Sequence, residues 1–211
     1  MRVVILMGGD NIHGRLMADE MRKASIIPDL IINEDGTPRA EKLQNFLANS
    51  QDNPPSVKTF PHYLGVSAFD GPESLNAIKT SKPDYLVIAG CGAIIRENIL
   101  SLATPLNIHP GLLPKYRGLD PVLWSVEHQK PVGATVHIMD SGIDTGNLLI
   151  SEAMPWQNAR SILELRLQCM RWGGTLLARF LKNPAAYPPQ KQDESKAAYF
   201  SAFPEDKKAA L

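Results

Sequence analysis

Two polar side chains end a hydrophobic run in the stretch LNIHPGLLPKYRG, residues 106–118. Residues two apart in a strand project to the same face, so Asn107 and His109 are expected to lie side by side. Pro110 holds His109 in extended backbone, and further prolines and glycines shape the loop as far as Gly118. An amide and an imidazole that each satisfy a buried backbone group would give the same pattern. Their pairing before a rigid loop favours a preorganised site for acid–base chemistry.

Two carboxylates follow in HIMDSGIDTG, residues 137–146, in a loop with two glycines. A carboxylate near His109 would stabilise its imidazolium form and orient the ring. Asp140 and Asp144 are the candidates, although aspartates are common in turns and neither means much alone. His137 precedes them on the expected strand, and a structural role and a supporting role in the site are equally consistent with the sequence.

The N-terminal stretch GGDNIHGRL nearly matches a phosphate-binding loop, because Gly9 and Gly14 bracket four residues. Arg15 and Leu16 replace the Lys and the Ser or Thr that such a loop requires. We therefore predict a tight turn from a strand to a helix, from which Arg15 is a weak candidate for a contact with a substrate phosphate. The five histidines are scattered without a third ligand at a recognised spacing, so no metal site is predicted.

Alternating strands and helices must position these groups. Hydrophobic runs and periodicity predict strands over 2–7, 29–33, 84–90, 106–109 and 133–140, and helices over 14–24, 38–48, 74–81, 98–103 and 158–181. The alternation predicts an α/β fold, a doubly wound, largely parallel sheet with helices on both faces. Residues 1–181 are expected to form one core domain. Residues 182–211 are rich in proline and charge, and are expected to be a tail without a core of its own.

Composition excludes some classes of function. The 211 residues include 22 Lys plus Arg and 22 Asp plus Glu, a formal net charge of zero, which gives no general attraction to nucleic acid or anionic membrane. The apolar run near the N-terminus is too short to span a membrane and lacks a signal-peptide cleavage pattern. Cys91 and Cys169 lie in apolar surroundings, which favours buried thiols over a disulfide. We expect a cytoplasmic protein without nucleic-acid or membrane partners, and the sequence leaves a homo-oligomer open.

The stretch NIHPGLLPKYRG, followed by VGATVHIMDSGIDTGNLL, resembles the formyltransferase family that uses 10-formyltetrahydrofolate, most strongly over residues 84–150. The resemblance implies a Rossmann-like catalytic domain over residues 1–181 with an Asn–His–Asp set at Asn107, His109 and Asp144. It also implies a pterin pocket formed by Gly92, Ala93, Ile94, Ile95, Met139, Asp140, Ser141 and Gly142. The chain has Gly111 where the family often has serine.

The resemblance also implies a mechanism. An amine of the substrate attacks the formyl carbon of the donor, and Asn107 donates a hydrogen bond to the oxyanion, a contact typically worth roughly 3 to 4 kcal/mol. His109, protonated or close to it, stabilises the oxyanion and passes a proton to the leaving nitrogen. Asp144 holds the imidazolium and takes the proton of the amine. Neither a metal nor a covalent intermediate is needed.

The acceptor amine is the least determined part. RGLDPVLWS, residues 117–125, is similar to amino-sugar formyltransferases, which favours a nucleotide-linked amino sugar as the small-molecule partner. Hydroxyornithine, methionyl-tRNA and glycinamide ribonucleotide are the alternatives. The weak candidates for binding the sugar and its diphosphate are Tyr116, Trp124, Lys115, Arg117 and Arg15. A non-catalytic module that binds folate or a nucleotide is the other class, and turnover that depends on an amine would exclude it.

Overall fold

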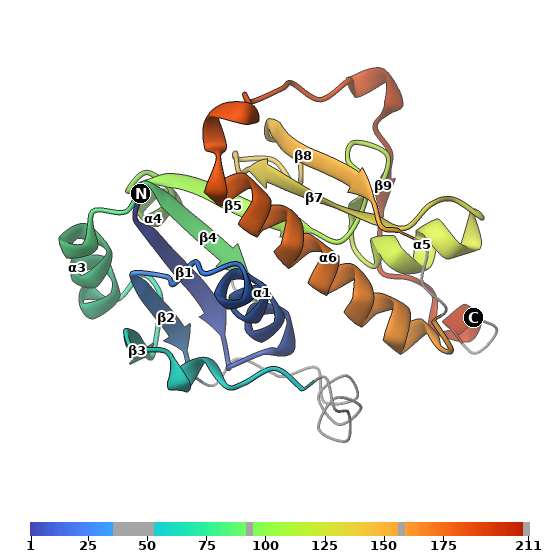
Figure 1. Cartoon of the computed structure of the whole chain (residues 1–211). Coiled ribbons are helices and arrows are strands. Elements are labelled where there is room, and N and C mark those ends of the chain that lie inside the picture. The colour runs from blue at the N-terminus through green and yellow to red at the C-terminus, as the bar shows by residue number, and fades with distance from the viewer. Residues whose placement is uncertain (36–52, 92–94, 156–158, 209–211) are drawn as a thin grey trace. The chain divides into compact units, whose positions relative to one another are not determined.

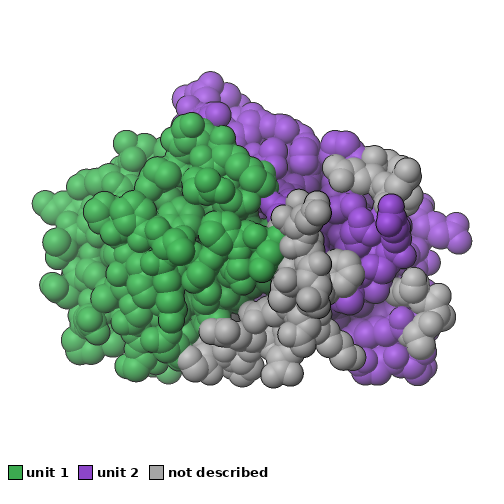
Figure 2. All heavy atoms as spheres, turned by 60° about the horizontal axis from the view of Figure 1, so that its bottom comes forward, with its two compact units in different colours: residues 1–107 green, residues 108–211 purple. Residues whose placement is uncertain are grey.

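The computed structural model describes residues 1–35, 53–91, 95–155 and 159–208 (Figure 1). The helix predicted over 38–48 and the pocket candidates Gly92, Ala93 and Ile94 lie outside these ranges. The chain divides into two compact units, Met1–Asn107 and Ile108–Leu211 (Figure 2). The expected boundary after residue 181 does not coincide with this division, since residues 182–208 belong to the second unit.

Unit 1 is built on parallel strands. They are β1 (Val3–Gly8), β2 (Leu30–Glu34), β3 (Tyr63–Val66), β4 (Tyr85–Ala89) and the first part of β5 (Thr104–His109). Their hydrogen bonds give the order β3-β2-β1-β4-β5, with Met7 opposite Ala89 and Ile88 opposite Asn107. Every residue of β1 is buried, as its unbroken apolar run predicts for a strand covered on both faces.

The helices in the described residues of unit 1 are α1 (Ile12–Lys23), α3 (Pro72–Ser81) and α4 (Glu97–Leu100), with the 3-10 turn η1 (Val57–Thr59). The chain steps from β1 outward to β3, then returns to β4 on the other side of β1. Right-handed crossovers in opposite directions put α1 and α3 on opposite faces, which is the doubly wound arrangement. The predicted tight turn precedes α1: Gly9 has φ +64°, and Asn11 caps the helix by accepting a 2.9 Å hydrogen bond from Gly14 N.

Unit 2 contains the end of β5 and a second group of elements. They are β6 (Arg117–Gly118), α5 (Pro121–Glu127), β7 (Gly133–Ile138), β8 (Leu148–Ala153), α6 (Ile162–Lys182), η2 (Pro184–Ala186), η3 (Glu194–Lys196), β9 (Tyr199–Phe200) and α7 (Glu205–Lys208). β7 and β8 form an antiparallel pair, and the seven-stranded sheet has the order β3-β2-β1-β4-β5-β7-β8. The predicted α/β fold with a largely parallel sheet is confirmed, although the sequence patterns missed β3, β6, α5, β8, β9 and α7.

The long helix α6 packs on β7 with the predicted apolar face, including Leu165, Cys169 and Leu176. The glycines inside it do not interrupt it. A Cβ atom at Gly173 would lie 2.6 Å from Cγ2 of Ile108, so a glycine there lets the helix approach the end of β5 closely. Both cysteines are free, and the Cys169 thiol is buried.

The segment after residue 182 packs against the rest of unit 2, which differs from the expected tail. β9 pairs in parallel with β6, and Phe203 is only 2% exposed, with its ring edge-on to Trp124 at 4.8 Å between centroids. Prolines and charges dominate the composition of this segment, but its two phenylalanines supply the apolar area that anchors it. No helix in the described ranges is long and apolar enough to cross a membrane.

Candidate active site

His109 is the last residue of β5 and is 4% exposed. Its Nε2 lies 2.6 Å from the carbonyl oxygen of Tyr116. Because a carbonyl oxygen can only accept a hydrogen bond, Nε2 carries a proton and donates it. The other ring nitrogen, Nδ1, lies 3.5 Å from Oδ2 of Asp144. In the neutral ring, Nδ1 is therefore unprotonated, and its lone pair faces the carboxylate of Asp144.

Asp144 lies in the loop between β7 and β8, with its side chain only 10% exposed. Its φ of +56° is in the left-handed region, which aspartate tolerates better than most residues. Oδ2 accepts a 2.9 Å hydrogen bond from Gly118 N, and Oδ1 lies 3.7 Å from Nε2 of His137. One carboxylate thus lies between two buried imidazoles.

Burial governs the charge of both histidines. It lowers the pKa of His109 below its ordinary value, while Asp144 and the Tyr116 carbonyl act in the opposite direction. Burial lowers the pKa of His137 to about 4, against the opposing effect of Asp144 and with a further lowering from His109. Burial thus disfavours the protonated form of His109, whereas the sequence analysis expected a ring that is protonated or close to it. Its Nδ1 can accept a proton, and the resulting imidazolium would form an ion pair with Asp144.

Asn107 lies two residues before His109 on β5 and is half-buried. The strand geometry keeps the side chains of these two residues on one face of β5, as the sequence predicted. Gly111 follows in the loop, where a Cβ atom would lie 2.9 Å from His109 Nε2 and 2.7 Å from Pro121 Cβ. The glycine that departs from the family pattern thus allows the loop to pass close to the imidazole.

Thr135 on β7 holds the loop that follows His109 through two hydrogen bonds, which the sequence did not indicate. Its buried hydroxyl donates to the carbonyl of Gly111 at 2.7 Å and accepts from Leu113 N at 3.1 Å. The backbone that follows His109 is thereby held by a side chain 24 residues further along the chain.

The C-terminal segment holds the Asp144 loop. Gln192 Nε2 donates to the carbonyl oxygens of Asp144 at 2.8 Å and Gly146 at 2.7 Å, and its Oε1 accepts from Arg117. Tyr199 Oη donates to the carbonyl of Ile143 at 2.9 Å. We call Gln192, Tyr199 and the Arg117–Glu194 ion pair the C-terminal clamp. It was missed because no local pattern links residues 192–199 to the loop.

Several predicted substrate-binding side chains have structural partners instead. Arg117 is buried and paired with Glu194 at 2.7 and 3.0 Å, so its charge is already compensated. Trp124 Nε1 donates to the carbonyl of Ser201 at 2.9 Å. In unit 1, Arg15 donates to Asn53 Oδ1 at 2.9 Å and to the carbonyls of the two prolines that follow. All three residues thus have hydrogen-bond partners within the described structure, and their contact with a substrate stays a prediction.

The remaining candidates differ in exposure. Met139 is half-buried, whereas Asp140, Ser141 and Gly142 are exposed. Asp140 Oδ1 accepts from Gly142 N and from Thr145 Oγ1, so this carboxylate stabilises its own turn. In unit 1, Ile95 is buried. Among the described residues, no three His, Cys, Asp or Glu side chains are grouped so that they could hold a metal ion.

Comparison with known proteins identifies the family to which this chain is similar. The model of the family described as formyl transferase matches residues 1–177. A methionyl-tRNA formyltransferase of Clostridium novyi (strain NT) is 33% identical over 153 residues, which make up 70% of this chain and 49% of that protein. The chain thus spans about half the length of the curated relatives that it matches.

Solved structures share the fold. A sugar N-formyltransferase from Shewanella sp FDAARGOS_354 has a TM-score of 0.62 at 24% identity, and the match covers 95% of this chain and 77% of that one. A phosphoribosylglycinamide formyltransferase from Anaplasma phagocytophilum has a TM-score of 0.64 at 17% identity, with 96% and 99% covered. At these identities the likeness concerns the fold alone.

Proposed function

The chain belongs to the formyl transferase family, and we propose on that premise that it transfers a formyl group from 10-formyltetrahydrofolate to a primary amine. The observation that carries the proposal is the buried pair of His109 and Asp144, with Nδ1 of the imidazole 3.5 Å from the carboxylate. A neutral imidazole whose protonated form gains an ion pair is suited to accept and return a proton during acyl transfer.

Each residue of the set has a distinct role in this proposal. Asn107 donates its amide hydrogen to the carbonyl oxygen of the formyl group as negative charge develops there. His109 moves the proton through Nδ1, because its Nε2 is occupied by the Tyr116 carbonyl. Asp144, fixed by Gly118 N, stabilises the imidazolium. The described contacts of His109 and Asp144 are with each other, with His137 and with backbone groups, and the proposed nucleophile is the amine of the substrate.

The formyl donor would supply the activated carbonyl carbon, and its pterin is proposed to bind at residues 92–95 and 139–142. The donor set at His109 fits such an acyl donor, since it provides a base and a carboxylate close together and shielded from water. Around Asp140, the loop 139–142 is held in a turn by hydrogen bonds of its own, which would give the proposed pterin pocket a defined edge.

For the acceptor we propose the amine of a nucleotide-linked amino sugar. The similarity of RGLDPVLWS, residues 117–125, to amino-sugar formyltransferases supports it, and a sugar N-formyltransferase shares the fold. Methionyl-tRNA is the second candidate, because the relative that is 33% identical carries that name. Hydroxyornithine and glycinamide ribonucleotide are the remaining acceptors to test.

The test is competition between amines. The protein is incubated with 10-formyltetrahydrofolate and, at equal concentrations, a nucleotide 3- or 4-amino sugar, hydroxyornithine, glycinamide ribonucleotide or methionyl-tRNA. Release of tetrahydrofolate and the mass of the product are followed. The proposal expects the highest kcat/KM for the amino sugar. A higher value for another amine removes the acceptor assignment alone, whereas binding of the donor without formylation of any amine indicates a non-catalytic module.

A further inference from the structure

His137 is a buried, titratable side chain that the proposed mechanism does not use. It is 2% exposed and lies on β7, just before the loop that carries Asp144. Its Nδ1 lies 3.1 Å from the carbonyl oxygen of Ile138, so this nitrogen carries a proton and donates it. In the neutral ring, Nε2 therefore has a lone pair. Among the described residues this buried atom has no hydrogen-bond partner, and it faces Oδ1 of Asp144 at 3.7 Å.

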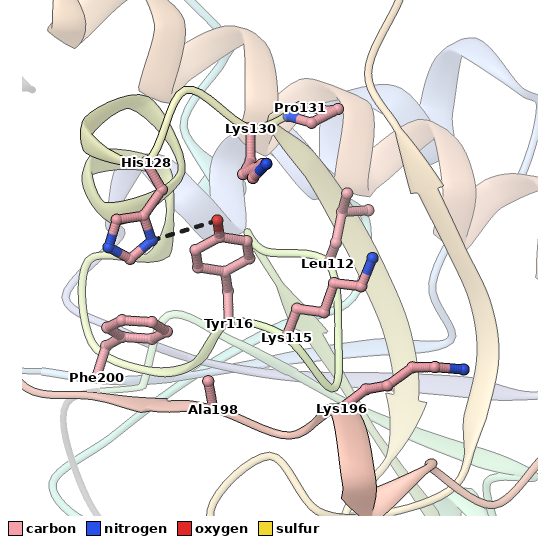
Figure 3. Close-up of a pocket in the computed structure, with 9 residues that line it drawn as sticks. All are labelled: Leu112, Lys115, Tyr116, His128, Lys130, Pro131, Lys196, Ala198 and Phe200. Atoms are coloured by element: carbon pink, nitrogen blue, oxygen red, sulfur yellow. Dashed lines mark hydrogen bonds between the residues drawn. The ribbon is translucent and has the colours of Figure 1, made fainter.

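The ring of His109 has the same arrangement at the other oxygen of the carboxylate. Its Nε2 donates to the carbonyl of Tyr116, and its Nδ1 faces Oδ2 of Asp144 at 3.5 Å. The ring of Tyr116 stacks on Phe200 with 5.4 Å between centroids, and its hydroxyl lies 3.4 Å from Nδ1 of His128 (Figure 3). Tyr116 is thereby held in place, so its carbonyl keeps Nε2 of His109 as a donor.

Two lone pairs thus face one carboxylate. We call His109, Asp144 and His137 the proton cluster. With both rings neutral, each lone pair lies opposite a negatively charged oxygen, and both contacts are repulsive. A single added proton turns one of these contacts into an ion pair. It also brings the net charge of the cluster to zero, which a buried site favours over a lone carboxylate.

The two rings compete for Asp144. Burial lowers the pKa of His137 to about 4, Asp144 opposes this effect, and His109 lowers the pKa further. A proton on His109 therefore keeps His137 neutral. Once His109 has given its proton away, the repulsion between the rings ends and the whole charge of Asp144 acts on His137. The cluster can thus hold one proton on either side of the carboxylate.

The remaining titratable groups around β7 do not take part in this competition. Asp140 lies in the same loop as Asp144, and its charge favours the protonated form of His137. Cys169 of α6 and Glu152 of β8 lie beside the first two residues of β7, at the opposite end of the strand from His137. The balance between the two imidazoles therefore depends mainly on the carboxylate that lies between them.

We propose that His137 is the second proton acceptor of the active site, where it acts through Asp144 and holds the proton that this carboxylate takes from the acceptor amine. The inference rests on the proposed formyl transfer. In that reaction the lone pair of the amine forms the bond to the formyl carbon, and the electron pair of the bond between this carbon and N10 stays on N10. The amine loses one proton and N10 gains one, so the solvent supplies none.

The proton cluster can carry out both transfers. His109 gives its proton from Nδ1 to N10, while Asp144 accepts the proton of the amine and passes it to Nε2 of His137. The distance between Nε2 and Oδ1 has to close by roughly 0.7 Å to reach the length of an ordinary hydrogen bond. The proton then returns across the carboxylate to His109, and the cluster again holds one proton. His137 is a positioning residue in this scheme, because it does not touch the substrate.

Single-turnover formylation by His137→Gln tests this role, because glutamine is polar but cannot hold an added proton. The rate is expected to fall about tenfold, a part of the 100- to 10,000-fold typical of acid–base catalysis, at an unchanged half-saturating donor concentration. In mixtures of H₂O and D₂O, the wild-type rate should follow a curve because two protons move, whereas the rate of the variant should fall linearly. His62→Gln, which removes an exposed histidine of unit 1, is the matched control. A wild-type rate or an unchanged curve in folded His137→Gln overturns the inference.

Nitrogen-15 NMR of the histidine rings in the full chain needs no turnover. Wild-type His137 should carry its proton on Nδ1 at pH 7 and gain a second only near pH 4. In His109→Gln its titration midpoint should rise by about one pH unit, as for two unit charges about 10 Å apart at an effective dielectric constant of about 20. An unchanged midpoint in the folded variant overturns the inference even where formyl transfer occurs. Formylation of no amine removes the proposed function instead, whereas the midpoint decides by itself whether the two rings share Asp144.

Discussion

Gln192→Leu tests whether the C-terminal clamp positions Asp144, the proposed catalytic carboxylate. The amide of Gln192 donates to the carbonyls of Asp144 and Gly146 and accepts from two nitrogens of Arg117, at 3.2 and 2.8 Å. Leucine has a similar size but can make none of these bonds. The two carbonyls would lose a partner, and Asp144 would lose the contact that holds its left-handed backbone.

The expected magnitude follows from those bonds. Each hydrogen bond to a backbone carbonyl contributes about 1 kcal/mol, and bonds to a charged group about 1.5 to 3 kcal/mol. Gln192 is half-buried, so water replaces part of the loss, and Glu194 still compensates Arg117. We expect the free energy of unfolding to fall by about 2 kcal/mol. A carboxylate displaced by a fraction of an ångström should lower kcat/KM by about 10- to 100-fold.

Urea unfolding gives the stability, and tetrahydrofolate release at low urea gives kcat/KM for the folded variant. Gln190→Leu is the matched control, since this glutamine is two residues earlier, its side chain is exposed, and only its backbone is bonded, to Leu148. The control should change neither quantity. A folded Gln192→Leu protein with wild-type kcat/KM would refute the positioning role, even if its stability fell as expected.

Three other predictions concern the buried set itself. His109→Ala and Asn107→Ala should each lower turnover at least about 100-fold in a protein that remains folded by circular dichroism; a near-wild-type rate would remove that residue from the mechanism. Asp144→Asn should be severely impaired and Asp140→Asn only mildly, because Asp140 is exposed and bonded within its own turn; the reverse order in the same assay would contradict the assignment. Folded His137 has a pKa of about 4, whereas a histidine in the unfolded chain has a pKa of about 6.5. Between these pH values the unfolded chain binds a proton that the folded chain does not bind. The free energy of unfolding should therefore fall by about 3 kcal/mol as the pH drops from 6.5 to 4. His137→Asn should show a flatter pH dependence in urea unfolding, and an unchanged slope would assign the acid lability to other groups.

The sequence determined the parts that depend on local pattern. Continuous apolar runs predicted the buried strands β1 and β4, because a strand covered on both faces needs apolar residues at every position. The same reasoning placed Asn107 and His109 on one face of β5, since the two-residue period of a strand is a local property. The strand β8 was missed because only one of its six residues is buried, so its apolar pattern carries little signal.

The residue types alone could not show which aspartate lies beside His109. Asp140 and Asp144 are both loop aspartates, and only the family resemblance selected Asp144. The structure gives the physical difference: Asp144 is 10% exposed and lies between two imidazoles, whereas Asp140 is exposed and stabilises a turn. The lowered pKa of His109 also required the structure, because its cause is burial, and burial is not a property of the sequence stretch alone.

Tertiary structure alone decided how the C-terminal segment meets the site. Gln192 is 48 residues from Asp144 in the sequence, and Phe203 packs on a tryptophan 79 residues before it. Such contacts depend on the path of the whole chain, so the composition of residues 182–211 suggested a tail where the structure has a clamp. The sequence therefore determined the strands and the paired residues on β5. The folded chain determined which carboxylate joins them and what holds it there, since hydrogen bonds between distant segments exist only after those segments have been brought together.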